Sequence, residues 1–394
     1  MQIWYNIYGD NMKKVGIIAE YNPFHNGHLY HLEETKKMFP GAYIVLVMSG
    51  NFTQRGDVSI INKWDKADIA LNYGVDLVIE LPFVFATQGA DIFAKASIEI
   101  LNKLDVDYLV FGSESNDIKK LTTLAEVQTN NKKYDNLVKE YLSEGINYPT
   151  ALSKALTDIT GIKMDKPNDI LGITYIREIM LQNSKIKPFT IKRNNDYNAK
   201  ELEDFYSSAT SIRYALKNDS DVSNVIPEYT SRFLNKKLMF IDDYFNLLKY
   251  NIMINENLDL IQTVDEGIHN RIKKFIINSK SLDDLILKVK TKRYTYNKIN
   301  RMFTHILCNF TKDEASKFDK LEYIRVLGFN NNGRLIIKNI KDDIDVPIIT
   351  NFSDIKSDML DIEFRSTCCY ASILNEADKI KMIESEYKNY PIQR

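Results

Sequence analysis

Short apolar runs alternate with amphipathic segments along the first half of the chain. Strand-like patterns occur at Val15–Ala19, Ala42–Met48, Asp76–Leu81, Tyr108–Gly112 and Pro188–Arg193. Helix-like spacing occurs at Gly27–Phe39, Lys63–Asn72, Gln88–Leu104, Asn168–Gln182 and Ser211–Leu216. This alternation predicts an α/β domain with a parallel sheet and helices on both faces. Right-handed crossovers place the carboxyl ends of the strands along one edge, where such folds bind ligands.

The second half of the chain is mainly helical in pattern. Asn, Asp and Ser cluster in Lys217–Asp221, and we expect a domain boundary near residue 220 there. Helical spacing continues to about residue 314, and strand-like patterns follow at Arg334–Ile340 and Asp345–Thr350. The expected organisation is an α/β domain at 12–220 and a mainly α-helical domain with a small β-containing end at 221–394.

Composition and charge are ordinary for a globular protein. The 394 residues include 52 basic and 53 acidic ones, and 44% are hydrophobic. The apolar stretch Leu81–Ala90 is far shorter than the roughly 18 residues of a membrane helix, so no span is predicted. The three cysteines form no CxxC pair, which favours a reducing cytoplasm. Residues 1–11 lack the features of a signal peptide, so we expect them to be an extension of little function and Met12 to be the usual start.

Three of the five histidines lie within seven residues, at His25, His28 and His31. They fall between the first predicted strand and the first predicted helix. Gly27 lets the backbone come close to a ligand, and His28 lies in the first helical turn, where free N–H groups and the helix dipole favour an anion. Two imidazoles beside a helix N-terminus suit a polyphosphate that undergoes substitution.

Two other interpretations of these histidines stay open. His25 and His28 have the spacing of a possible zinc pair, although no nearby cysteine completes it and Glu20 would serve only if the loop folded back. A purely structural role at the surface is also compatible with the sequence. We predict no metal site.

Two short motifs resemble those of the nucleotidyltransferase superfamily, which includes class I aminoacyl-tRNA synthetases and small adenylyltransferases. His25-Asn26-Gly27-His28 resembles its HxGH signature, and 208–213 resembles its second motif, ISSTxIR, with Ala209 where a serine is usual. Thr210 and Ser211 can cap a helix and bind phosphate. Arg213 can bind phosphate oxygens in a bidentate fork. The resemblance implies a Rossmann-like, HIGH-type nucleotidyltransferase domain with His25, His28 and Arg213 as catalytic residues.

Further motifs are similar to those of the tRNA(Met) cytidine acetate ligase family, from Met12 to the C-terminus. They are Glu20–His31, Met48–Phe52, Gln54–Gly56, Lys63-Trp64, Phe111–Glu114, Lys166–Asn168 and Lys292–Thr295. In that family ATP and acetate form acetyl-adenylate, and the acetyl group passes to N4 of the wobble cytidine (position 34) of elongator tRNA(Met). The resemblance implies ATP as a substrate with Mg²⁺, acetate and elongator tRNA(Met) as partners, and no obligatory protein partner.

The resemblance also implies an ATP site. Its expected members are Ile18, Ala19, Glu20, Tyr21, Asn22, Pro23, Phe24, His25, Asn26, Gly27, His28, Leu29, Tyr30, His31, Gly112, Asn168, Arg193, Asn194, Thr210 and Ser211. For Gly112 an ordinary turn, and for Asn168 a helix cap, are alternative roles.

The segment after the second strand has the glycines and polar groups of a substrate loop. Candidates for acetate or phosphate are Ser49, Gly50, Asn51, Arg55 and Lys63. Arg55 could instead form a surface salt bridge, and Lys63 could be a solvated helix lysine. Trp64 fits the core better than a stacking role.

A basic segment lies far downstream. From Arg271 to Arg301 there are ten Lys or Arg and two Asp, a difference of +8. Phosphate neutralisation and aromatic stacking predict an RNA surface, and a solvated basic helix face is the alternative. The candidates are Lys288, Lys290, Lys292, Arg293, Tyr294, Lys298 and Arg301.

Two other functions compete with the acetate ligase. A small-molecule adenylyltransferase usually needs only the first domain, so the second domain with its basic segment argues against it. A non-catalytic RNA-binding protein with a relic pocket is opposed by the presence of both histidines, Gly27 and Arg213.

Overall fold

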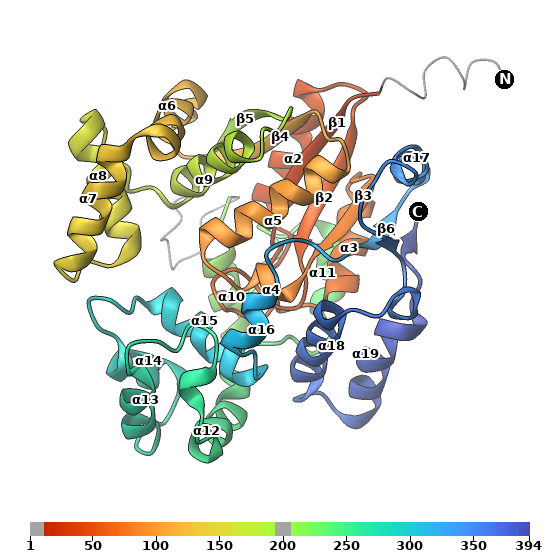
Figure 1. The fold of residues 1–394 in the computed structure, drawn as a ribbon. Helices are drawn as coiled ribbons and strands as arrows, with labels where there is room; N and C mark the ends of the chain where they lie inside the picture. Colours follow the sequence, from red (N-terminus) through yellow and green to blue (C-terminus); the bar gives the residue numbers. More distant parts are fainter. Residues whose placement is uncertain (1–11, 194–205) are drawn as a thin grey trace, which may run out of the picture.

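The computed structural model describes residues 12–193 and 206–394 (Figure 1). The predicted N-terminal extension, 1–11, and the candidate Asn194 lie outside the described residues. Within the described part, no helix combines the length and the apolar character needed to cross a membrane.

A mixed sheet of eight strands forms the centre of the fold, in the order β5-β4-β1-β2-β3-β6-β7, with β8 paired to β6. The five strands of the first half are parallel, as the alternating pattern predicted, and β6 runs antiparallel to β3. The strands are β1 (Lys14–Ala19), β2 (Tyr43–Ser49), β3 (Leu77–Leu81), β4 (Tyr108–Ser113), β5 (Lys187–Lys192), β6 (Ile324–Phe329), β7 (Ile348–Ile349) and β8 (Ile392–Gln393).

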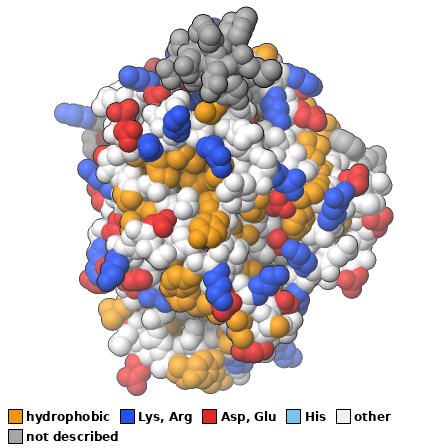
Figure 2. Space-filling model, turned by 90° about the vertical axis from the view of Figure 1, so that its right-hand side faces the viewer, with side chains coloured by type: hydrophobic (Ala, Val, Ile, Leu, Met, Phe, Trp, Pro, Cys, Tyr) orange, Lys and Arg blue, Asp and Glu red, His pale blue; other side chains and the backbone are white. Residues whose placement is uncertain are grey.

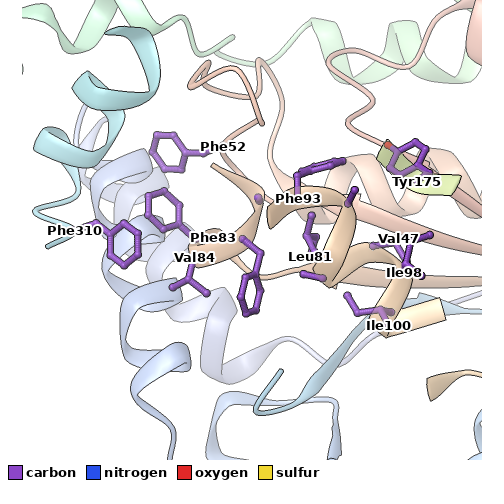
Figure 3. Close-up of a cluster of buried hydrophobic side chains, with 14 of the residues drawn as sticks. Val47, Phe52, Leu81, Phe83, Val84, Phe93, Ile98, Ile100, Tyr175 and Phe310 are labelled. Atoms are coloured by element: carbon purple, nitrogen blue, oxygen red, sulfur yellow. The ribbon is translucent and has the colours of Figure 1, made fainter. Parts of the chain in front are cut away.

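The helices of this part of the chain are α2 (Asn26–Met38), α3 (Lys63–Asn72), α4 (Phe83–Ala86), α5 (Ala90–Lys103), α6 (Ile118–Asn130), α7 (Lys132–Ser143), α8 (Tyr148–Thr160), α9 (Pro167–Leu181), α10 (Ala209–Lys217) and α11 (Glu228–Leu234). Helices cover both faces of the sheet, whereas α7 and α8 form a pair that packs on α6, away from the strands. Because side chains alternate along a strand, Val45 and Val47 of β2 join the core with α5, part of which Figure 3 shows. Ile44 and Leu46 join the core with α2 and α3 on the other face.

A helical group follows and packs beneath the sheet in Figure 1. It consists of η1 (Ile241–Tyr244), α12 (Phe245–Ile254), η2 (Leu258–Leu260), α13 (Ile268–Ile276), α14 (Leu282–Val289), α15 (Tyr296–Leu307) and α16 (Lys312–Lys317). We call 241–317 the helical group. The mainly helical pattern predicted for this part of the chain is confirmed.

The C-terminal part departs from the prediction. The segment expected as a strand at Arg334–Ile340 is a helix, α17 (Asn331–Ile340), and the strand is the preceding segment, β6. Asn330 stops the strand because its side chain accepts the backbone N–H groups of Asn332 and Gly333 and caps α17. The second expected strand, Asp345–Thr350, contains only the short β7.

After the helical group the chain therefore returns to the first sheet instead of forming a separate β-containing end. β6 pairs with β3, and β7 and β8 pair with β6. η3 (Phe352–Asp354), α18 (Asp358–Ala371) and α19 (Glu376–Lys388) lie between β7 and β8, beside this edge.

Candidate active site

The HxGH segment lies at the carboxyl end of β1, where α2 begins. His25 is the N-cap of α2, and its Nδ1 accepts the backbone N–H of Gly27 at 3.0 Å. The backbone N–H of His25 donates to Nδ1 of His28 at 3.4 Å, and the two ring centroids lie 3.9 Å apart. Because Nδ1 of His25 is an acceptor, its neutral ring carries the proton on Nε2.

All three clustered imidazoles are neutral at neutral pH. Burial, together with the nearby guanidinium groups of Arg193 and Arg213, lowers the pKa of His25 to about 3. Burial also lowers the pKa of His31 to about 4. Burial and the neighbouring His25 hold the pKa of His28 well below its usual value, although a hydrogen bond with the Pro23 backbone acts in the opposite direction. The rings can therefore donate N–H groups to phosphate without carrying a charge.

The second motif is brought against the first. Ser208 caps α10, since its Oγ accepts the backbone N–H of Ser211 at 3.1 Å. Arg213, on α10, donates to the carbonyl oxygen of Asn22 at 2.8 Å and forms an ion pair with Asp57 at 3.2 Å. The two motifs, about 190 positions apart in the chain, thus share one site.

A cavity of about 230 Å³ lies between these motifs. Its wall includes most of the residues predicted for ATP and catalysis, namely Ile18, Ala19, Glu20, Tyr21, Asn22, His25, Gly27, His28, Tyr30, His31, Gly112, Asn168, Arg193, Thr210 and Arg213. Phe24 is instead fully buried in the core. Ser211 is also buried, and its backbone N–H is the group that the Ser208 cap of α10 accepts. Pro23, Asn26 and Leu29 do not line the cavity.

Two predicted ATP residues have roles that the structure makes specific. At Gly112, a Cβ would lie 3.1 Å from Cγ of Arg193, so the arginine side chain would have to shift by a few tenths of an ångström to admit a larger residue. Asn168 is not the N-cap of α9, because Lys166 has that position. Its side-chain amide donates to Glu114 at 2.6 Å, and this contact fixes the start of α9 beside the cavity.

Sequence reasoning missed several apolar and polar residues of the cavity wall. They are Ile17, Gln54, Phe93, Phe111, Leu171, Tyr175, Ile191, Lys192, Tyr206, Ser208 and Ala209. Gln54, Phe111, Ser208 and Ala209 lie inside motifs that the sequence analysis quoted, so their position was available from the sequence. Phe93, Leu171 and Tyr175 lie on helices whose apolar pattern indicates only packing.

The acetate and phosphate candidates divide into two groups. Arg55 lines the cavity, whereas Ser49, Gly50, Asn51 and Lys63 do not. The Asn51 side chain accepts the backbone N–H of Lys63 at 3.0 Å and donates to Thr367 at 3.3 Å, so it ties α3 to α18.

Lys63 is neither a phosphate ligand nor a solvated lysine. It is completely buried, and its Nζ lies 2.7 Å from Glu80, 2.8 Å from Glu386 and 3.3 Å from Glu363. Arg325 of β6 pairs with Glu80 at 3.0 Å and with Glu386 at 2.6 Å. We call these five residues the buried ion network. The prediction for Lys63 is corrected, because a buried charge that already has carboxylate partners is not available to ATP.

Trp64 belongs to the core, as expected. It is 6% exposed and its indole N–H donates to Ser385 at 3.1 Å.

The basic segment forms α13, α14 and the start of α15. Lys290, Lys292 and Arg293 are exposed in the loop before α15, and Lys288 and Lys298 are half-buried. Some of the charge is compensated locally, since Lys288 pairs with Asp284 at 2.7 Å and Arg293 with Glu266 at 3.2 Å. Figure 2 views the molecule from the right-hand side of Figure 1, the side of α17 and away from α13 and α14, and on this face basic and acidic side chains are interspersed.

Two residues predicted to contact RNA, Tyr294 and Arg301, instead bind other parts of the protein. Tyr294 is 4% exposed, and its hydroxyl donates to the carbonyl oxygen of Asp265 at 2.7 Å, so its ring is not free to stack on a base. Tyr296 is the exposed aromatic residue here, at 42%. Arg301 points toward the first domain, where it donates to the carbonyl oxygen of Gln54 at 3.3 Å.

Comparison with known proteins agrees with this fold. A sequence model of the family described as HIGH Nucleotidyl Transferase matches residues 12–386. The parallel sheet, the HxGH loop at the end of β1 and the second motif on α10 are those of a HIGH-type nucleotidyltransferase.

Relatives that match along nearly their whole length identify the particular family within this class. Proteins named tRNA(Met) cytidine acetate ligase from Geobacillus sp. (strain WCH70) and Caldicellulosiruptor bescii are 40% and 41% identical, over 97% of this chain and 100% and 98% of their own lengths. Crystal structures of Thermotoga maritima TmcAL, apo and bound with alpha-thio ATP, are 32% and 31% identical, with TM-scores of 0.90 and 0.86. Each alignment covers 97% of this chain and 99% of the TmcAL chain. The chain belongs to the tRNA(Met) cytidine acetate ligase family.

Proposed function

We propose that this protein activates acetate with ATP and transfers the acetyl group to N4 of the wobble cytidine of elongator tRNA(Met). The observation that supports this most directly is the cavity in which the HxGH loop, Arg213 and Arg55 meet. The relatives named above supply the identity of the substrates, and the solved relative bound with alpha-thio ATP supports ATP as the nucleotide.

In the first step an acetate oxygen attacks the α-phosphorus of ATP. A new P–O bond forms, the bond to the β-phosphate oxygen breaks, and pyrophosphate leaves. His25 and His28 donate N–H groups to phosphoryl oxygens, and Arg213 adds a charge-assisted contact. These fixed donors stabilise the charge that develops in the transition state, because they are already oriented in a site removed from bulk water.

Magnesium fits this site only as an ion that enters with the nucleotide. Among the described residues, no group of three His, Cys, Asp or Glu side chains could hold a metal ion, and the described cavity wall contributes one carboxylate, Glu20. Mg²⁺ commonly keeps few protein ligands and binds phosphate oxygens. Bound in that way, it would neutralise part of the charge of the triphosphate.

In the second step the exocyclic amine of cytidine attacks the acetyl carbonyl carbon. The C–N bond forms, the C–O bond to the phosphate breaks, AMP leaves and the amine loses one proton. The adenylate is already an activated acyl donor, so no cysteine or serine nucleophile is required. Positioning of the base against the adenylate then carries much of the rate.

The tRNA is proposed to bind along the loop before α15. Lys290, Lys292 and Arg293 are exposed there, and Lys288, Lys298 and Tyr296 lie beside them. Such charges neutralise phosphates, and an exposed aromatic ring can stack on an unpaired base.

The test uses the full chain, labelled acetate, ATP and tRNA(Met), followed by digestion to nucleosides. We expect labelled N4-acetylcytidine. We also expect that His28→Ala abolishes acetate-dependent ATP–pyrophosphate exchange and leaves tRNA binding unchanged. Absence of acetylcytidine with intact ATP and tRNA would refute the proposal, and exchange stimulated by a phosphorylated small molecule instead of acetate would favour a small-molecule adenylyltransferase.

A further inference from the structure

A short loop after β2 carries two side chains into the cavity. Phe52 and Val58 pair as an antiparallel bridge and close this loop. Gln54 and Arg55 occupy its tip, and both line the cavity. We call residues 53–57 the Arg55 loop. The position of the Arg55 guanidinium depends on how this tip is held.

The tip is held by one helix of the helical group. The backbone carbonyl oxygens of residues 54, 55 and 56 each accept a hydrogen bond from a side chain of α15. In the order of the loop, the donors are Arg301 (Nη1, 3.3 Å), Asn300 (Nδ2, 3.2 Å) and Thr304 (Oγ1, 2.6 Å). Three successive carbonyls bound by one helix fix the path of the loop backbone, not only a single side chain.

The two backbones also touch. Gly56 has φ +76°, and a Cβ at this position would lie 2.3 Å from the backbone nitrogen of Arg301. Any other residue would therefore push the loop away from α15. Asn300 is 5% exposed and Thr304 is completely buried, so water does not compete for these contacts.

Glu20, the residue that follows β1, also holds this tip. The backbone N–H of Gln54 donates to a carboxylate oxygen of Glu20 at 2.8 Å. Burial lowers the pKa of Arg55, the carboxylates of Glu20 and Asp57 raise it, and the guanidinium of Arg213 lowers it. Arg55 thus lies within electrostatic reach of Arg213 of the second motif, on the side of the cavity where phosphate is expected.

We propose that Thr304 and Asn300 are positioning residues for the carboxylate substrate. Through the loop carbonyls they set the place of the Arg55 guanidinium, which binds the carboxylate of acetate beside the α-phosphate. The helical group is then part of the acetate-activating site as well as a binding surface for tRNA. This inference rests on the proposed function, because it assigns to Arg55 the acetate of that reaction.

The experiment measures acetate-dependent ATP–pyrophosphate exchange in the absence of tRNA. Thr304→Val keeps the shape of the side chain and removes the donor. We expect the KM for acetate to rise about tenfold, as loss of one buried hydrogen bond to a substrate-positioning loop allows, with the KM for ATP and the affinity for tRNA within twofold of wild type. Thr304→Ser, which keeps the hydroxyl, should restore the KM for acetate.

Thr157→Val is the matched control. Thr157 also donates to backbone carbonyls, of Ser153 and Ile162, but on α8 and away from the cavity wall. Its KM for acetate should equal that of wild type. If Thr304→Val does not fold, Asn300→Ala takes its place, with the same expected rise.

The outcomes separate the inference from the proposed function. If wild-type protein shows no acetate-dependent exchange, the proposed function fails. If wild type is active but the Thr304 and Asn300 variants keep the wild-type KM for acetate, the positioning role is wrong. A parallel loss of ATP and tRNA binding in these variants would show a general structural role and would also overturn the inference.

Discussion

At the scale of single residues, His25 combines two functions on two ring nitrogens. Its Nδ1 accepts the Gly27 N–H and caps α2, which leaves Nε2 as the donor available to a phosphate. The pKa of about 3 means that the ring is neutral and that this donor is present at neutral pH. Substitutions that replace only one of the two ring nitrogens can therefore separate the structural role of His25 from its role in phosphate binding.

The first prediction compares His25→Asn with His25→Gln. An Asn side-chain oxygen can occupy the place of Nδ1 and keep the cap, whereas it offers nothing at the place of Nε2. We expect His25→Asn to fold with a thermal midpoint near that of wild type and to lose about 10²- to 10³-fold in ATP–pyrophosphate exchange rate, the typical effect of removing one donor from an anion-stabilising site.

His25→Gln should have the opposite pattern. Its amide nitrogen can imitate Nε2, but it no longer caps α2, so the thermal midpoint should fall while more activity is retained than in His25→Asn. Differential scanning calorimetry and exchange kinetics on the same samples check both variants. Equal activity in the two variants would contradict the assignment of the donor to Nε2.

Sequence patterns predicted the site only where its residues are close in the chain or belong to a motif. The HxGH loop and the 208–213 segment were found in this way, and the cavity contains most of their residues. The burial of Lys63 was not predictable, since two of its three carboxylate partners lie about 300 positions downstream. Tyr294 was misinterpreted for a similar reason, because its hydroxyl is used by the backbone of Asp265.

At the scale of elements, periodicity predicted the strands and helices of the first half well. β2, β3 and β4 are largely buried on both faces and read as apolar runs, whereas β5 lies at the edge of the described sheet and is only partly buried. Helices such as α5, α6 and α7 are amphipathic. The same reasoning failed at 334–340, which is part of α17. Ile336 and Ile340 are one helical turn apart, and both are buried. A short segment with several β-branched residues fits both the alternating pattern of a strand and the spacing of a helix. Only the cap that Asn330 provides decides in favour of the helix.

The second prediction concerns the exposed loop before α15. Replacement of Lys290, Lys292 and Lys298 by alanine should weaken tRNA(Met) binding and reduce the slope of log K against log salt by about two, since each phosphate contact to a single strand contributes about 0.7. Acetate-dependent ATP–pyrophosphate exchange without tRNA should stay at the wild-type rate. Filter binding at several salt concentrations gives the slope.

Three lysines on the other side of the molecule provide the control. Lys338 and Lys341 are exposed on and directly after α17, and Lys356 is exposed between η3 and α18. Figure 1 shows α17 and α18 on the opposite side of the molecule from α13 and α14. Their replacement by alanine changes the net charge by the same amount and should leave the salt slope unchanged. A similar loss in both triple variants would mean that only the overall charge matters, and the proposed tRNA surface would be wrong.

At the scale of the whole molecule, the order of elements along the chain hides how they assemble. The helical group is inserted between β5 and β6, and the chain then returns to add β6 beside β3. The buried ion network joins this returning part to the first half, because Lys63 and Glu80 come from α3 and β3, and Arg325, Glu363 and Glu386 from β6, α18 and α19. The sequence pattern changes near residue 220, but strands from both sides of this position belong to one sheet.

The third prediction tests this network as the link between the two ends of the chain. Lys63→Met leaves three carboxylates with one guanidinium in a buried site, so we expect the free energy of unfolding to fall by about 3–5 kcal/mol. Burial first, and Glu80 next, raise the pKa of Glu363 to about 7. A raised carboxyl pKa means that folding favours the protonated form, so stability is lost as pH rises toward that pKa.

Without the nearby ammonium group the pKa of Glu363 should rise further, and the variant should continue to lose stability above pH 7, where wild type no longer does. Urea denaturation at pH 6, 7 and 8 measures the difference, which should widen with pH. Lys37→Met, which removes one partner of the surface pair with Glu34, should leave the midpoint nearly unchanged. Since Lys63 lies outside the cavity wall, the KM for ATP of the folded Lys63→Met protein should match wild type. A large rise in that KM with unchanged stability would return Lys63 to the nucleotide site and contradict the network as the link between the two parts.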